Sequence, residues 1–173
     1  MKIGIIADTH LSQREDPEKF KSLLDQLSSS FKDVDRIIHA GDVCDKKLLR
    51  ELETIAPTIC VKGEEDQRLD EPQFKKIKAG IYKIGIIHQL PDHLKDFFDQ
   101  NELDILIHGH THYPLIKGTP YDKLLLNPGS PTNPKKAPKK TGFDEPRAKK
   151  TVLTLKIDED TNMFSTFIVN LKT

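Results

Sequence analysis

Aspartate and histidine side chains, which are common ligands of divalent cations, recur in short clusters along the chain. The clusters are Asp8-Thr9-His10, His39-Ala40-Gly41-Asp42, Gly63-Glu64-Glu65-Asp66, the isolated His88, and His108-Gly109-His110-Thr111-His112. Six of the seven histidines lie in these clusters, and only His93 lies elsewhere. Carboxylate oxygens combined with neutral imidazoles suit hard or borderline divalent metals. The clusters therefore predict a metal site.

The number of candidate ligands exceeds what a single ion takes, which is roughly four to six protein and water ligands. Two divalent cations about 3.5–4 Å apart can share a carboxylate and together stabilise an in-line displacement at phosphorus. Asp42 follows Gly41, which permits close backbone approach, and we expect it to bridge the two ions. One histidine alone would more often be a structural residue. The joint pattern argues against that interpretation, because buried unpaired polar groups are costly.

Buried strands and amphipathic helices lie between the clusters. Apolar runs predict strands over residues 2–8, 35–39, 57–61 and 104–108, and helical apolar spacing predicts helices over residues 17–27, 46–55 and 91–100. The β-α-β-α-β order of the first half is typical of a parallel sheet covered by helices. Sites in such sheets form beyond the carboxyl ends of the strands, so we expect the clusters to converge on one edge.

The remaining segments alternate in the manner of antiparallel strands. They cover residues 74–78 and 81–88, 114–117 and 124–127, and 151–157 and 163–170. A parallel first half with antiparallel additions predicts an α/β fold: a four-layer α/β/β/α sandwich of two mixed sheets. The length of 173 residues predicts one domain over residues 1–173.

Composition excludes several classes of protein. Twenty-seven basic residues balance 27 acidic ones, which disfavours long nucleic acid as a partner. Two cysteines, Cys44 and Cys60, exclude a disulfide scaffold and a cysteine-rich zinc module. No apolar run reaches the roughly 20 residues that span a bilayer, and the first residues do not resemble a signal peptide, so we expect a cytoplasmic protein without membrane association.

One segment, residues 131–150, differs from the rest in composition. It contains four prolines and seven basic residues without an apolar period, and it predicts a long loop. Two interpretations remain open: a solvated insertion, or a basic rim for an anionic substrate or partner. The second interpretation leaves a nuclease as one alternative function.

The ordered motifs Asp8-x-His10, Gly41-Asp42, the Gly63 turn, His88 and Gly109-His110-x-His112 resemble the calcineurin-like metallophosphoesterase superfamily. The chain length, the segment 127–130 and the terminal hairpin resemble its small prokaryotic phosphodiesterases of the YfcE type. The retromer subunit of related fold is similar in size. The resemblance extends from Met1 to about Ser130 and through the last two strands.

This resemblance implies roles for individual residues. Asp8, His10 and His112 would hold the first metal, His88 and His110 the second, and Asp42 would bridge them. The family usually has an asparagine ligand after the third-strand glycine, where this chain has Glu64, which can still ligate. The next position, often His or Cys, is Glu65, and the second histidine of the usual His-Gly-His motif is absent after His88.

The implied function is metal-dependent hydrolysis of a phosphate ester by a metal-bound hydroxide, with Asp8, His10, Asp42, His88, His110 and His112 as the catalytic set. The resemblance favours diesters, a small substrate that could be a nucleotide, and two divalent ions: Mn²⁺ first, with Zn, Fe or Ni as alternatives. A catalytically weak scaffold on the same fold is the alternative function. Homo-oligomerisation stays open.

Predictions can also be made for four further residues near the motifs. His39 and His108 either orient the ligands or simply end their strands. We expect Cys44 to pack beneath the site, without a part in the reaction. Ser130 lies either at the site or in a structural turn.

Overall fold

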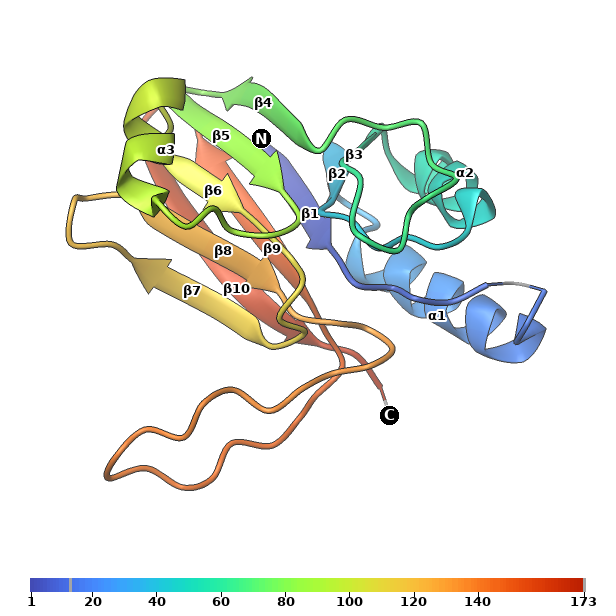
Figure 1. Cartoon of the computed structure of the whole chain (residues 1–173). Helices are drawn as coiled ribbons and strands as arrows, with labels where there is room; N and C mark the ends of the chain where they lie inside the picture. The colour runs from blue at the N-terminus through green and yellow to red at the C-terminus, as the bar shows by residue number, and fades with distance from the viewer. Residues whose placement is uncertain (13, 173) are drawn as a thin grey trace.

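The computed structural model describes residues 1–12 and 14–172. Two five-stranded sheets pack face to face, and helices cover their outer faces (Figure 1). The helices are α1 (Pro17–Ser30), α2 (Lys46–Ile55) and α3 (Leu94–Asn101). The strands are β1 (Lys2–Ile6), β2 (Arg36–His39), β3 (Thr58–Cys60), β4 (Phe74–Ala79), β5 (Tyr82–Ile87), β6 (Ile105–Ile107), β7 (Pro114–Gly118), β8 (Leu124–Pro128), β9 (Thr151–Asp158) and β10 (Met163–Asn170).

Both sheets are mixed. The first has the order β10-β9-β1-β2-β3, in which β1, β2 and β3 are parallel and the hairpin β9–β10 is antiparallel. The second has the order β4-β5-β6-β8-β7, in which β5, β6 and β8 are parallel and the two edge strands are antiparallel. The carboxyl ends of the central parallel strands of each sheet therefore lie at one end of that sheet.

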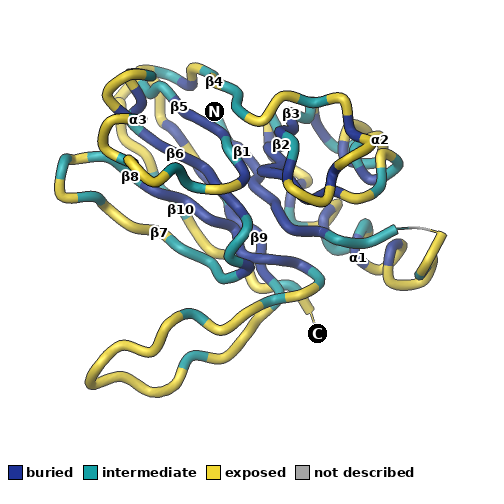
Figure 2. The backbone as a smooth tube through the Cα atoms, in the orientation of Figure 1, coloured by how far each residue is buried: buried dark blue, intermediate teal, exposed yellow. Residues whose placement is uncertain are grey.

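The main core lies between the sheets and consists of aliphatic side chains. Ile3, Ile5 and Ile38 of the first sheet pack with Ile84 and Ile107 of the second, all fully or almost fully buried. Each such side chain contributes roughly 1.5–3 kcal/mol through burial. The central strands are buried along most of their length (Figure 2), which is why they are continuous apolar runs in the sequence.

The helices complete the outer layers. The Asp16 side chain accepts a hydrogen bond from the Lys19 backbone N–H at 3.0 Å and caps α1, whose Phe20 and Leu27 pack with Val152 on the outer face of the first sheet. Phe98 of α3 covers the second sheet. The four-layer α/β/β/α arrangement is confirmed.

The elements expected from sequence all form, with bounds that differ by up to three residues; α3, expected over residues 91–100, begins at Leu94. Strand β1 ends at Ile6, before Asp8, because Asp8 has a left-handed backbone with φ of 52°. Helix α1 continues through Ser30, and its last hydrogen bond runs from the N–H of the C-cap residue Phe31 to the Leu27 carbonyl at 2.8 Å.

Residues 131–150 form a loop that extends away from the sheets (Figure 1) and is largely exposed (Figure 2). It contains neither helix nor strand, as its sequence predicts. Within the described residues, no helix has the length and apolar character needed to cross a membrane.

Candidate metal centre

The polar clusters come together at one edge of the sandwich. Asp8 and His10 follow β1, Asp42 follows β2 and Glu64 follows β3, whereas His88 follows β5 and the pair of histidines His110 and His112 follows β6. Every residue predicted as a ligand belongs to at least one group whose donor atoms lie within 4.8 Å of one another. Both sheets therefore contribute to one site.

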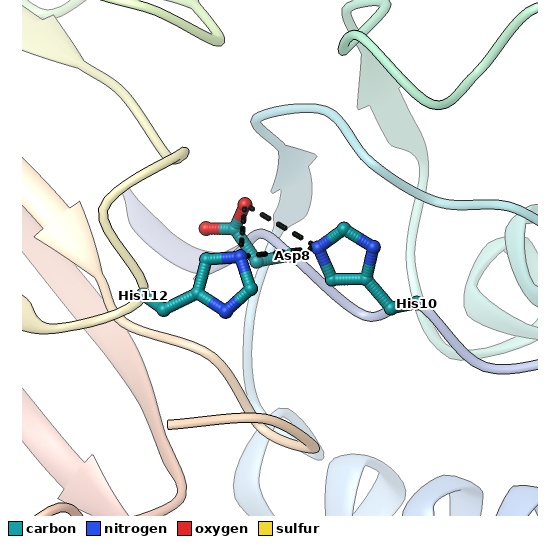
Figure 3. Close-up of side chains that lie close together, drawn as sticks. All are labelled: Asp8, His10 and His112. Atoms are coloured by element: carbon teal, nitrogen blue, oxygen red, sulfur yellow. Dashed lines mark hydrogen bonds and ion pairs between the residues drawn. The ribbon is translucent and has the colours of Figure 1, made fainter. Parts of the chain in front are cut away.

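The first group consists of Asp8, His10 and His112. Figure 3 shows the three side chains pointing toward a common position. The Nε2 atoms of His10 and His112 lie 3.2 Å apart, and they lie 3.9 and 3.6 Å from Asp8 Oδ1. Two imidazole nitrogens and a carboxylate oxygen thus surround a space suited to one cation.

The second group adjoins the first through Asp42. Its Oδ2 lies 3.2 Å from His88 Nε2 and 3.5 Å from His10 Nε2, so this carboxylate lies between the two groups. His110 Nδ1 lies 3.3 Å from Glu64 Oε2, and these two residues form a ligand group with His88. Asp42 therefore occupies the position that a bridging ligand requires.

Hydrogen bonds fix which nitrogen of two histidines faces the site. His88 Nδ1 donates to the Ala40 carbonyl, and His112 Nδ1 donates to the Asn133 carbonyl, both at 2.8 Å. Because a carbonyl only accepts, the neutral ring has its lone pair on Nε2. His88 Nε2 and Asp8 Oδ2 are buried without a hydrogen-bond partner among the described residues. These unpartnered atoms fit a bound cation.

Without a cation, Asp8 and His88 hold protons more strongly than usual and Asp42 holds one more weakly. Burial raises the pKa of Asp8 to about 7. Burial opposes protonation of His88, but the Asp42 carboxylate, with Oδ2 3.2 Å from Nε2, prevails and raises the His88 pKa to about 9. Burial also acts against ionisation of Asp42, yet the nearby His88 ring and the hydrogen bond from the Glu65 backbone N–H lower its pKa to about 2. A dication would displace these protons.

The backbone at the site is strained. Asp8, His10, Asp42, His110 and His112 all have positive φ, between 40° and 69°. Non-glycine residues rarely adopt this conformation, which costs on the order of 1–3 kcal/mol each and is concentrated at functional sites. The surrounding structure holds this backbone in place, since the Ser130 hydroxyl donates to the Asp8 carbonyl at 2.7 Å.

Gly63 permits β3 to approach Asp42. A Cβ atom at Gly63 would lie 2.1 Å from Asp42 Oδ1 and 2.4 Å from the Asp42 backbone nitrogen. No side chain fits there, so the glycine lets the backbone N–H of Glu65 donate to Asp42 Oδ1 at 3.0 Å.

The sequence that forms this site matches a known domain family. Residues 1–159 match the calcineurin-like phosphoesterase superfamily domain. The chain belongs to the calcineurin-like phosphoesterase superfamily. The expected family is thereby confirmed, and with it a metallophosphoesterase at the level of the general reaction class.

Two curated relatives of this metallophosphoesterase are archaeal. It is 36% identical over 143 residues to a probable metallophosphoesterase of Methanothermobacter thermautotrophicus, covering 78% of this chain and 80% of the relative. It is 43% identical over 142 residues to a probable metallophosphoesterase of Methanocaldococcus jannaschii, covering 78% of this chain and 70% of the relative.

Two solved structures illustrate the range of the fold. Vps29 of Entamoeba histolytica, complexed with Zn²⁺, superposes with a TM-score of 0.69 at 25% identity, covering 98% of this chain and 99% of Vps29. An archaeal phosphodiesterase superposes with a TM-score of 0.66 at 21% identity, covering 98% of this chain and all of that one, which is a likeness of fold alone.

Asp66 is a residue of the metallophosphoesterase site to which the sequence assigned no role. Its buried carboxylate accepts hydrogen bonds from the backbone N–H groups of Val43, Cys44 and Gly63, each at 2.9 Å. It thereby ties the loop after β2, which contains Asp42, to the loop after β3. The only sequence signal was a third acidic residue following Gly63.

The expected packing of Cys44 beneath the site was wrong. Cys44 is exposed, with Sγ 3.8 Å from His10 Nδ1, because its φ of 63° turns the side chain outward. Glu65 is also exposed and lies on the same side of His10, 3.7 Å from Nδ1. These two side chains flank the first ligand group.

His39 and His108, for which two roles were left open, are buried behind the candidate ligands. His39 Nε2 lies 3.1 Å from the Thr9 hydroxyl, and His108 Nδ1 lies 3.2 Å from Asn127 Nδ2. Burial lowers the pKa of both to about 4, so both rings are neutral. Neither belongs to a ligand group among the described residues, and both contact residues beside the site.

Proposed function

We propose that this metallophosphoesterase is a phosphodiesterase that uses two divalent cations. The observation that carries the proposal is the position of Asp42, whose Oδ2 lies 3.2 Å from a histidine of one ligand group and 3.5 Å from a histidine of the other. Asp8, His10 and His112 would hold one ion, and Glu64, His88 and His110 the other. We take Mn²⁺ as the first candidate metal.

Bound at this site, a pair of divalent cations lowers the pKa of water and offsets charge on the phosphoryl oxygens. The chain itself holds the candidate ligands in their positions. The Nδ1 hydrogen bonds of His88 and His112 orient both rings before any substrate binds. Asp66 and Ser130 hold the strained loops of Asp42 and Asp8 in place. Such preorganisation avoids reorganisation during the reaction.

The charges around the site favour a diester over a monoester. Glu65 is exposed beside the two proposed metal sites and belongs to neither, so its carboxylate can repel a phosphate. A diester carries one negative charge, whereas a monoester carries up to two near neutral pH. Repulsion by Glu65 therefore acts more strongly on the monoester.

The shape of the surface also supports two ester groups. One pocket beside the centre is lined by residues that include Lys62, Glu64 and His88. A second is lined by residues that include His10 and Asn133. The first pocket adjoins Glu64 and His88 of one ligand group and the second adjoins His10 of the other, so each can receive one alcohol of a small diester.

The test compares two substrates with metal-stripped protein to which Mn²⁺ is returned: bis(p-nitrophenyl) phosphate and p-nitrophenyl phosphate. We expect Mn²⁺-dependent hydrolysis with the diester preferred, and a smaller preference in the Glu65→Gln variant. A monoester preference in the wild type would overturn the diester assignment. Equal loss of both activities in the Glu65→Gln variant would instead assign Glu65 to metal binding alone.

A scaffold protein is the second candidate function. It is favoured by the likeness to Vps29, whose TM-score is 0.69, and by Glu64 at the position where the family usually has asparagine. This candidate predicts that metal binds but that neither substrate is hydrolysed with Mn²⁺, Zn²⁺, Fe²⁺ or Ni²⁺. Hydrolysis that disappears in a His112→Ala variant would exclude it.

A further inference from the structure

Strand β10 is an unprotected sheet edge. The eight residues Met163–Asn170 contain no proline and no charged residue. The other three sheet edges are protected: β3 has three residues, β4 contains three lysines, and β7 begins with Pro114 and contains Lys117. Short strands, lysine and proline are the devices by which proteins prevent edge pairing, and β10 has none of them.

The side chains of β10 are apolar and exposed on both faces of the sheet. Met163 is 67% exposed, Phe164 40%, Phe167 62% and Ile168 38%. The register with β9 assigns Phe164 and Ile168 to the face of the buried Ile157 and Leu153, whereas Met163 and Phe167 lie on the opposite face. A strand added at this edge would cover apolar surface on both faces.

The register also shows which backbone groups face outward. Ile157 of β9 exchanges both backbone hydrogen bonds with Met1, so the odd-numbered residues of β9 pair with β1. The even-numbered residues of β9 then pair with odd-numbered residues of β10, such as Ser165 opposite Lys156. The backbone N–H and C=O groups of Phe164, Thr166 and Ile168 therefore point to the free edge.

We propose that β10 pairs antiparallel with β10 of a second copy of this chain, forming a symmetric dimer with a continuous ten-stranded sheet. We place the centre of this pairing at Thr166, an outward-facing residue near the middle of the strand. Thr166 then lies opposite its own copy, and Phe164 lies opposite Ile168. Cross-strand pairs of an aromatic with a β-branched residue stabilise a sheet. The inference rests on the edge and is independent of the proposed reaction.

The charges at the two ends of β10 are complementary in this pairing. Asp158 ends β9, Glu159 and Asp160 lie in the turn before β10, and Lys172 follows the strand. The antiparallel register places the acidic turn of one copy beside Lys172 of the other. A parallel pairing would place the acidic turns side by side, and like charges would oppose it.

The first test is the mass of the full-length protein in solution, measured by analytical ultracentrifugation over a range of concentrations. We expect a species of twice the 19.7 kDa of one chain. Ile168→Lys should shift the equilibrium to monomer, with at least a tenfold weaker dimer. The matched control is Ile116→Lys on the edge strand β7, where the isoleucine is equally exposed, and its mass should stay that of the wild type.

The second test is a crosslink that depends on the register. Thr166→Cys, made with Cys44→Ser, should form an intermolecular disulfide on mild oxidation, because paired residues have a Cα separation of about 5.5 Å. Ser165→Cys in the same background should crosslink far less, because the Ser165 residues of the two copies lie diagonally across the strand pair and not directly opposite each other. A monomeric wild type at all concentrations, a dimer unaffected by Ile168→Lys, or equal crosslinking of both cysteines would overturn the proposal.

Discussion

His10 and His112, which are separated by 101 residues in the chain, face each other through their Nε2 atoms at 3.2 Å, with their rings stacked at 4.9 Å. His112 Nδ1 donates to the Asn133 carbonyl, so its Nε2 offers a lone pair toward His10 when the ring is neutral. Asp8 Oδ1 lies within 3.9 Å of both nitrogens. A cation bound between the three atoms would satisfy all of them.

Replacing His112 tests this arrangement. His112→Ala removes a nitrogen ligand, and we expect the affinity for Mn²⁺ to fall by more than the roughly 10–100-fold that loss of a supporting residue causes. Isothermal titration calorimetry of metal-stripped protein measures the change. His93→Ala is the matched control, because His93 is exposed at the start of α3 and lies outside the ligand groups found among the described residues. Equal affinities in the two variants would contradict the assignment.

The stability of the metal-free protein should depend on pH. The His88 pKa, raised to about 9 in the folded state, contributes stability that is present below about 6.5 and is lost as pH rises through 9. The raised pKa of Asp8 likewise contributes stability at low pH, and this contribution is lost as pH rises to about 7. The His88 shift corresponds to a loss on the order of 3 kcal/mol.

Urea unfolding between pH 6 and 9.5 measures this dependence. With saturating Mn²⁺ the trend should reverse, because deprotonated ligands bind the ion more tightly and binding stabilises the folded state. Below pH 4, both forms should lose stability as Asp42, whose folded pKa is about 2, becomes protonated. Parallel curves with and without Mn²⁺ from pH 6 to 9.5 would argue against protons and metal competing for one site.

Asp66 should be required for stability. Asp66→Ala leaves three backbone N–H groups without their acceptor, and two of them belong to buried residues, Val43 and Gly63. We expect the free energy of unfolding to fall by about 3 kcal/mol or more. Asp70→Ala, at an exposed position of the same loop, should change it by less than about 0.5 kcal/mol. Thermal unfolding of both variants distinguishes the two expectations.

Lys135 should contribute to substrate binding. Its positive charge lowers the pKa of both Asp8 and His112. Its backbone N–H donates to the His112 carbonyl at 3.0 Å. Lys135→Ala should raise KM for an anionic diester about fivefold, corresponding to ~1 kcal/mol, and leave kcat nearly unchanged. Lys139→Ala, in the same exposed loop, is the control and should leave KM unchanged. An equal rise of KM in both variants would show that only the overall charge of the loop matters.

The sequence predicted the layers and the position of the site because both follow from apolar runs. Buried strands such as residues 104–108 are continuous apolar segments, and the polar residues after them must lie at strand ends. The left-handed backbone of Asp8 and His10 could not be predicted, since only distant groups such as the Ser130 hydroxyl hold it. The exposure of Cys44 follows from its own left-handed backbone, with φ of 63°, and could not be predicted from the sequence either.

The most direct measurement of the central claim is diester hydrolysis as a function of bound Mn²⁺. Metal-stripped protein is titrated with Mn²⁺, and turnover of bis(p-nitrophenyl) phosphate is plotted against the number of ions bound per chain. The account predicts little activity at one ion, full activity at two, and loss of this activity in Asp42→Ala, which removes the shared carboxylate. Full activity at one ion, or no activity with two ions bound, would contradict it.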